Sequence, residues 1–167
     1  MRAPASWRRS TLAACAWGLL ALVGGCGFHL QGHVELPRSL ANARLEASDQ
    51  QSDFYISLHR ALYTAGARFD GPEAEAANIR ILEDSSSERI LTVSARNTPT
   101  AFLLSYHIKV AVDYQGRTLL PAEAHTVSRE YSFDESELLA KKRESDILRQ
   151  ALADDLAALI MQRMAAL

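Results

Sequence analysis

The clearest pattern in the chain is over Leu104–Tyr114, where six large apolar residues stand at every second position. Successive side chains of a strand project to opposite faces, so this alternation predicts a half-buried antiparallel strand. Gln115-Gly116 follows and predicts a two-residue hairpin, because glycine tolerates a positive φ. The polar face of the strand is expected to stay partly uncovered, and its row of residues is Ser105, His107 and Lys109.

Weaker strand signals flank this segment. Asn42–Ala47 is a candidate first strand, Asn78–Glu83 alternates weakly, and Arg89–Ala95 is rich in β-forming residues. A return strand is expected over 118–131. Pro121 interrupts it and cannot donate to a ladder, so it belongs at a sheet edge or a bulge.

Two segments have helical spacing. The first begins at Ser52-Asp53 and should end at Gly66, in the left-handed conformation. The second is a long C-terminal helix of about 30 residues, roughly 45 Å. Asp134 and Glu137 have the spacing of a capping box at its start. Its expected apolar stripe is Leu138, Ile147, Leu148, Leu152, Leu156, Leu159, Ile160 and Met164.

These elements predict an α+β fold in which two helices pack on one face of a mostly antiparallel sheet of four to five strands. The opposite sheet face would be polar. We expect three segments: a lipoprotein signal peptide over 1–25, a lipidated tether over 26–40 and a single α+β domain over 41–167.

The first residues have the composition of a secretory signal. Arginines stand at the start, no acidic residue precedes Cys26, and the apolar run Thr11–Val23 is followed by small residues. That run has about 13 residues, fewer than the roughly 20 that span a bilayer. Its end, Leu22-Val23-Gly24-Gly25-Cys26, resembles the bacterial lipobox. The alternatives are a plain signal peptide with a chance cysteine and a short buried helix.

The lipobox resemblance implies an S-diacylglycerol on Cys26, cleavage before it and N-acylation of its amine. Cys15 would be removed with the signal, so no disulfide can form within the mature chain. Three acyl chains would anchor the protein stably, whereas one binds only marginally. Gly27 stands where an aspartate would resemble an inner-membrane retention signal. We therefore expect the periplasmic side of the outer membrane.

The charge of the chain argues against nucleic acid as a partner. Removing residues 1–25 from the 167-residue chain leaves 142, enough for one domain. The chain has 18 basic and 20 acidic residues, and loss of three arginines with the signal brings the formal net charge from −2 to −5. No basic run suggests nucleic-acid binding.

Motifs of catalysis and cofactor binding are missing from the sequence, so we expect no enzyme activity and no cofactor. His29 and His33 are four residues apart, but their segment is not helical and has no evident third ligand. We therefore predict no metal site. His107 and His125 are expected to be ordinary solvated histidines.

Two groups of cations remain. Arg96-Asn97-Thr98-Pro99 should form a turn between strands, and Lys141-Lys142-Arg143 lies early in the last helix. Such cations can contact a phosphorylated ligand. The alternative is that they only keep the surface soluble.

Several separated stretches together resemble the LptE family of lipopolysaccharide-assembly lipoproteins. The resemblance covers nearly the whole mature chain in order. The stretches are Cys26-Gly27-Phe28-His29-Leu30, Leu36-Pro37, Arg96-Asn97, Arg129-x-Tyr131 and Leu139-Ala140-Lys141.

The resemblance implies a fold of two helices on a four-stranded sheet. It implies a protein that plugs the LptD β-barrel, helps it assemble, and takes part in lipopolysaccharide transport to the outer leaflet. It also implies lipopolysaccharide contact at a turn arginine and a helix lysine, which fall here on Arg96 and Lys141. Ala95 departs from the pattern, because the family often has a bulky residue before the turn arginine.

Two other classes of function remain open. The protein could be a purely structural or chaperone lipoprotein of an outer-membrane barrel that never touches lipopolysaccharide. It could also be a periplasmic enzyme or a solute-binding lipoprotein, which a deep apolar pocket with convergent polar groups would indicate.

Overall fold

The computed structural model of the protein describes residues 35–72, 75–133 and 138–167. The strands form one sheet in the order β1-β2-β3-β4. β1 pairs with β2 in parallel, and the two other pairings are antiparallel. The elements in chain order are η1 (Arg38–Leu40), β1 (Ala43–Ala47), α2 (Asp53–Thr64), β2 (Ala77–Val93), β3 (Pro99–Tyr114), β4 (Arg117–Ser132) and α3 (Leu138–Ala165).

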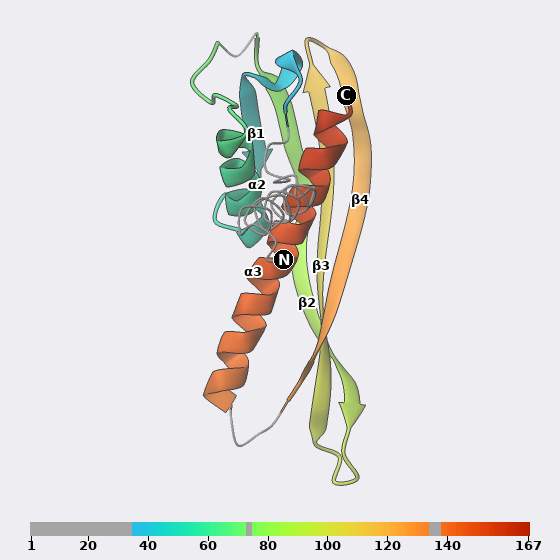
Figure 1. The fold of residues 1–167 in the computed structure, drawn as a ribbon. Helices are drawn as coiled ribbons and strands as arrows, with labels where there is room; N and C mark the ends of the chain where they lie inside the picture. Colours follow the sequence, from blue (N-terminus) through green and yellow to red (C-terminus); the bar gives the residue numbers. More distant parts are fainter. Residues whose placement is uncertain (1–34, 73–74, 134–137) are drawn as a thin grey trace, which may run out of the picture. The chain divides into compact units, whose positions relative to one another are not determined.

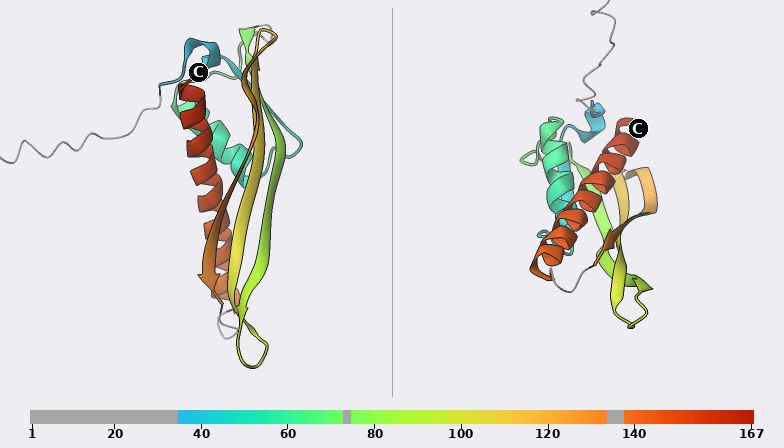
Figure 2. Two further views of the ribbon diagram at one scale, coloured as in Figure 1. Left: turned by 90° about the vertical axis from the view of Figure 1, so that its right-hand side faces the viewer. Right: turned by 60° about the horizontal axis from the view of Figure 1, so that its bottom comes forward.

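Both helices cover the same face of the sheet, and the other face has no helix over it among the described residues (Figures 1 and 2). α2 is the crossover that the parallel pairing of β1 and β2 requires. The predicted α+β class, with two helices on a mostly antiparallel sheet, is therefore confirmed, with four strands. The largest fully buried side chains are Phe54, Leu40, Leu58, Leu62, Ile79, Ile108, Leu152, Leu156, Ile160, Met164, Val110 and Val112.

Both ends of α2 are capped by local contacts. The Ser52 hydroxyl accepts the backbone N–H of Tyr55 at 3.1 Å, which satisfies a donor that the first turn would otherwise leave free. Gly66 has φ +91°, and the N–H of Ala67 donates to the carbonyl of Leu62 at 3.0 Å. This is the long hydrogen bond of a Schellman motif. The prediction that Gly66 ends the helix is confirmed.

The β2–β3 hairpin is longer than the sequence predicts. The prediction of two separate strands over Asn78–Glu83 and Arg89–Ala95 was wrong, because β2 continues through the polar segment Asp84–Glu88. β3 likewise begins at Pro99, earlier than expected. Each residue of the polar segment pairs with one of β3, from Asp84 opposite Ile108 to Glu88 opposite Leu104. Cross-strand pairing here overrides weak intrinsic β-propensity.

The predictions for the second hairpin and for its proline are confirmed. Gln115 has φ 49° and Gly116 has φ 73°, the two positive values of a type I′ turn. β4 is an edge strand. A register shift in it places Pro121 and Ala122 opposite Ala111 alone, which is a β-bulge. The proline therefore lies both at an edge and in a bulge.

The apolar stripe of α3 is confirmed at six of its eight predicted positions, and the side chain of Leu138, one of the other two, lies outside the described residues. Leu152, Leu156, Ile160 and Met164 are buried, and Leu148 and Leu159 pack against the core while partly exposed. Ile147 was predicted to be buried but is 69% exposed. It precedes Leu152 by five residues, which turns it about 140° away from the buried stripe. The expected cap, Asp134 and Glu137, lies outside the described residues.

The difference between the two sides of α3 can be tested with a pair of alanine variants. Leu156→Ala should lower the free energy of unfolding by about 2–5 kcal/mol, because it leaves a cavity beneath a fully buried side chain. Ile147→Ala should change it by less than about 0.5 kcal/mol. Urea unfolding followed by circular dichroism measures both, and equal losses would contradict this placement of α3.

Candidate functional site

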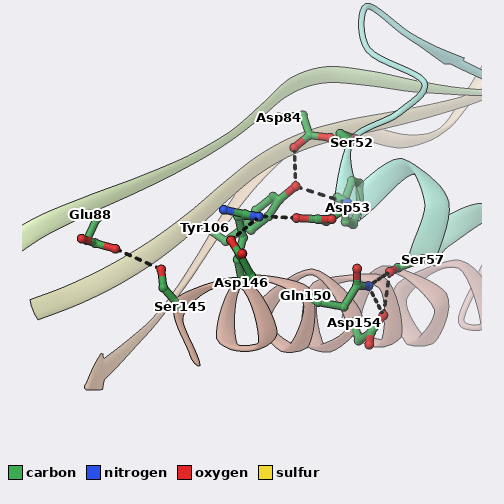
Figure 3. A network of polar contacts seen from close by, with 12 residues as sticks. Ser52, Asp53, Ser57, Asp84, Glu88, Tyr106, Ser145, Asp146, Gln150 and Asp154 are labelled. Carbon is green, nitrogen blue, oxygen red and sulfur yellow. Dashed lines mark hydrogen bonds and ion pairs between the residues drawn. The ribbon is translucent and has the colours of Figure 1, made fainter. Parts of the chain in front are cut away.

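A hydrogen-bond network centred on Tyr106 fixes the N-terminal end of α2 against the long strands (Figure 3). The buried Tyr106 hydroxyl donates to Asp84 Oδ1 at 2.9 Å and accepts the backbone N–H of Phe54 at 3.2 Å. The Ser52 hydroxyl donates to the other oxygen of Asp84 at 2.5 Å. Burial, and then the hydrogen bond and negative charge of Asp84, raise the pKa of Tyr106. The network joins β2, β3 and α2.

A second set of polar contacts joins the two helices (Figure 3). Ser57, a buried polar residue of α2, donates to Asp154 at 2.6 Å and accepts from Gln150 at 2.9 Å. Arg149 of α3 forms an ion pair with Asp53 of α2 at 2.8 Å. The hydrogen bond from Arg149 to Asp53 raises the pKa of the guanidinium. The helices are therefore held in register with each other by side chains as well as by packing.

Side chains near both ends of α3 also contact the sheet. Arg163 donates to both carboxylate oxygens of Glu123 on β4, at 2.9 and 3.0 Å, and lowers the pKa of that carboxyl. Nearer the other end of α3, the Ser145 hydroxyl donates to Glu88 of β2 at 3.1 Å. The Ser145–Glu88 contact fixes the first part of α3, which carries the predicted lysine site, relative to the strands.

The turn that carries Arg96 is ordered by its neighbours. The Ser94 hydroxyl accepts the backbone N–H groups of Arg96 at 3.2 Å and Thr98 at 3.3 Å. Asn97 has φ 60°, a conformation that asparagine adopts more readily than most residues. These bonds use the backbone of Arg96, and the residue itself is exposed. The turn therefore presents the guanidinium to solvent at the tip of the β2–β3 hairpin.

Lys141 lies in a different environment. Its ammonium contacts Glu144 at 2.8 Å and the Ser132 hydroxyl at 3.4 Å, and only 14% of its side chain is exposed. The lysine therefore ties the first turns of α3 to the end of β4. Lys142 and Arg143 beside it are exposed. The sequence alone presents the three cations as one cluster. It cannot distinguish their burial, because that burial depends on how α3 meets the sheet.

The two predicted cation sites are brought to the same end of the domain. The hairpin tip and the start of α3 both lie at the bottom of Figure 1, away from η1 and the end of α3. They are carried by separate elements that the Ser145–Glu88 contact connects. Cys26, the predicted lipidation site, lies outside the described residues.

The uncovered sheet face carries a row of paired polar side chains. His107 contacts Thr126 at 2.9 Å through Nδ1 and Glu83 at 3.0 Å through Nε2, and Lys109 contacts Glu83 at 3.2 Å. The hydrogen bond with His107, followed by that from Lys109, lowers the pKa of Glu83. The prediction of a polar open face is confirmed. His107, however, has defined partners on two neighbouring strands and is not simply solvated.

The described part of the chain has neither a cluster of metal-ligating side chains nor a helix that could span a membrane. Within residues 35–72, 75–133 and 138–167, no three His, Cys, Asp or Glu side chains gather in a way that could hold a metal ion. No helix in the same ranges is both long and apolar enough to span a membrane. His29 and His33, the pair considered from the sequence, fall outside these ranges.

Comparison with known proteins supplies the family. The lipopolysaccharide-assembly family LptE matches residues 40–164, which include the sheet and most of α3. The chain belongs to the LptE family. The LPS-assembly lipoprotein LptE of Yersinia pestis (strain Pestoides F) is 25% identical over 150 residues, covering 88% of this chain and 72% of the relative. The LptE of Yersinia pseudotuberculosis serotype O:1b has the same identity and coverage.

Solved structures share the fold. Rare lipoprotein B from Shewanella oneidensis aligns with a TM-score of 0.66 at 22% identity, covering 75% of this chain and 94% of the other. An uncharacterized lipoprotein B from Nitrosomonas europaea aligns with a TM-score of 0.67 at 24% identity, covering 84% and 91%. At these identities the likeness concerns the fold alone.

Membership of LptE identifies the chain as a lipopolysaccharide-assembly lipoprotein associated with a membrane. LptE is not known as an enzyme or cofactor-binding family. The predicted family is thus confirmed. The roles of Cys26, Arg96 and Lys141 within it stay predictions.

The Tyr106 network gives a prediction for stability. Tyr106→Phe should lower the free energy of unfolding at pH 7 by about 1–3 kcal/mol, because the Phe54 N–H and Asp84 each lose a partner. The raised pKa means that the unfolded chain releases this proton first as the pH rises above about 10. The native protein should therefore lose stability above that pH, and the variant should lose less.

Urea unfolding at a series of pH values between 7 and 11 measures both effects. Tyr63→Phe is the control, because Tyr63 is 70% exposed. An unchanged free energy at pH 7 together with an unchanged alkaline slope in Tyr106→Phe would contradict the role of the network.

Proposed function

We propose that this protein is an outer-membrane lipoprotein that plugs the LptD β-barrel and helps it to assemble. In this role it takes part in lipopolysaccharide transport to the outer leaflet and contacts the lipopolysaccharide. The observation that carries the proposal is the match to the LptE family over residues 40–164, which spans nearly all of the described fold. The uncovered polar sheet face supports it, because such a face suits contact with the polar interior of a barrel.

The proposed arrangement begins at the lipidated N-terminus. Residues 1–25 are the signal peptide, Cys26 carries the S-diacylglycerol and N-acyl chains, and residues 26–40 tether the domain of residues 41–167. The described chain starts at Glu35 and passes through η1, which lies at the opposite end of the domain from the hairpin tip (Figure 1). The 28 residues of α3 extend over about 42 Å. The cations are therefore held well away from the point where the tether enters the fold.

In this proposal the lipid A phosphates of lipopolysaccharide contact Arg96 and Lys141. Arg96 is exposed and can form a two-point contact with a phosphate. Lys141 already pairs with Glu144, so a phosphate there has to compete with that carboxylate. Arg96 should therefore contribute more to binding than Lys141.

The Lys141–Glu144 pair also favours the second candidate function. If Lys141 serves only to join α3 to β4, the protein is a structural or chaperone lipoprotein of the barrel without lipopolysaccharide contact. In that case its surface would match the barrel and no cation would be needed for a ligand.

Charge reversal separates the two candidates. Arg96→Asp in the full-length protein should reduce the lipopolysaccharide that copurifies from membranes by about tenfold, because a charge-assisted phosphate contact becomes a repulsion. Lys141→Asp should have a smaller effect. Arg117→Asp is the control. Arg117 is also an exposed arginine next to a hairpin turn, but its turn, Gln115-Gly116, is at the end of β3 far from Arg96.

The readout is the lipopolysaccharide bound per mole of tagged protein, with circular dichroism to verify that each variant is folded. Unchanged copurification in a folded variant with both Arg96→Asp and Lys141→Asp would exclude these residues as the contact and favour the structural candidate.

A further inference from the structure

The distal part of the β2–β3 hairpin differs in charge from the rest of the chain. We call residues 89–102 the hairpin arm. Its only charged residues are Arg89 and Arg96, and no aspartate or glutamate occurs between Glu88 and Asp113. The whole chain has more acidic than basic residues. The arm is therefore a locally cationic segment of an otherwise acidic protein, and it favours an anionic partner.

The same arm exposes three large apolar side chains. Ile90 is 54% exposed, Leu91 is 41% exposed and Val93 is 53% exposed. Register shifts between Ile90 and Thr92 and between Thr92 and Val93 disturb the regular alternation of this part of β2. The three residues stand between Arg89 and Arg96 in the sequence. Large apolar side chains that are exposed this close together along a strand favour a binding surface.

The apolar surface extends from β2 across to β3 and β4. Ile90 is paired with Phe102 on β3. The Phe102 ring stacks with Tyr131 at a centroid distance of 5.7 Å and meets the edge of Phe133 at 5.1 Å. The exposed side chain of Ile90 therefore borders an aromatic cluster that is itself only partly buried at Phe102 and Phe133.

The opposite end of the domain has different chemistry. A hollow of about 300 Å³ lies there, lined in part by Arg44, Glu46, Asn78 and Asp113. Arg44 pairs with Glu46 at 3.1 Å, and Asp113 pairs with Arg80 at 2.6 Å. Charges of both signs compensate each other at that end. The hairpin arm differs, because its only charged residues are cations and it also exposes large apolar side chains.

We infer that Ile90, Leu91 and Val93 bind acyl chains of the same lipopolysaccharide whose phosphates contact Arg96. This inference rests on the proposed function and assigns the apolar half of the ligand to named residues. A molecule with phosphates beside hydrocarbon chains satisfies both features of the arm, because the cations pair with the phosphates and the apolar side chains are removed from water.

Site-specific photo-crosslinking in living cells tests this inference with the full-length lipidated protein. Benzoylphenylalanine, which reacts with nearby C–H bonds, is placed singly at positions 90, 93 and 95, so that Arg96 is kept in every probe variant. Position 56 is the control, because Ile56 is an exposed isoleucine (39%) on α2, outside the arm. After irradiation, the purified protein is analysed by intact mass and with an antibody against lipid A.

Positions 90 and 93 should yield about tenfold more lipopolysaccharide adduct than position 56, as a contact by a few buried methylene groups implies. Adding Arg96→Asp should remove most of that adduct. Adducts at position 95 but not at 90 or 93 would overturn this inference and leave the proposed lipopolysaccharide contact intact. Adducts at none of the three positions would overturn both. Adducts at 90 and 93 with protein alone would make the apolar surface a protein interface and overturn the inference.

Discussion

Burial of the apolar face of β3 beneath two helices is the interaction on which the rest of the structure depends. Leu104, Tyr106, Ile108, Val110 and Val112 are all buried on that face. Only the apolar face of the sheet has to be buried. The opposite face can therefore carry polar pairs such as His107 with Glu83. The same strand continues beyond the helices as one side of the hairpin arm, so its pairing with β2 also supports the turn that presents Arg96.

Local polar contacts then convert this layered packing into a defined geometry. Tyr106 and Asp84 fix the start of α2 to the strands, and Ser57 with Asp154 joins the helices. Hydrophobic burial has little directional preference, whereas buried hydrogen bonds specify one arrangement. The start of α3 and the hairpin tip therefore keep a fixed relation, which a site divided between two elements requires.

Sequence patterns predicted the elements whose side chains alternate or repeat clearly. β3, the Gln115-Gly116 turn, the Gly66 cap and the bulge or edge position of Pro121 follow from local rules. The strand through Asp84–Glu88 does not, because its pairing depends on β3 and its residues have low β-propensity. To predict that Ile147 is exposed, one would need to know which side of α3 all of its buried residues share. The Lys141–Glu144 and Lys141–Ser132 contacts depend on how α3 meets β4, so the family resemblance could assign Lys141 to the proposed site without showing that it is partly buried.

In the proposed function, a lipid anchor, a folded domain and a cationic, apolar arm act together in lipopolysaccharide assembly. The proposed plug role can be tested by purifying the full-length, C-terminally tagged protein from detergent-solubilised outer membranes and identifying every species by intact mass. If the protein is a plug, a stoichiometric large β-barrel is recovered together with this chain, acylated at Cys26. Recovery of the acylated chain without a barrel would retain the anchor and contradict the plug role.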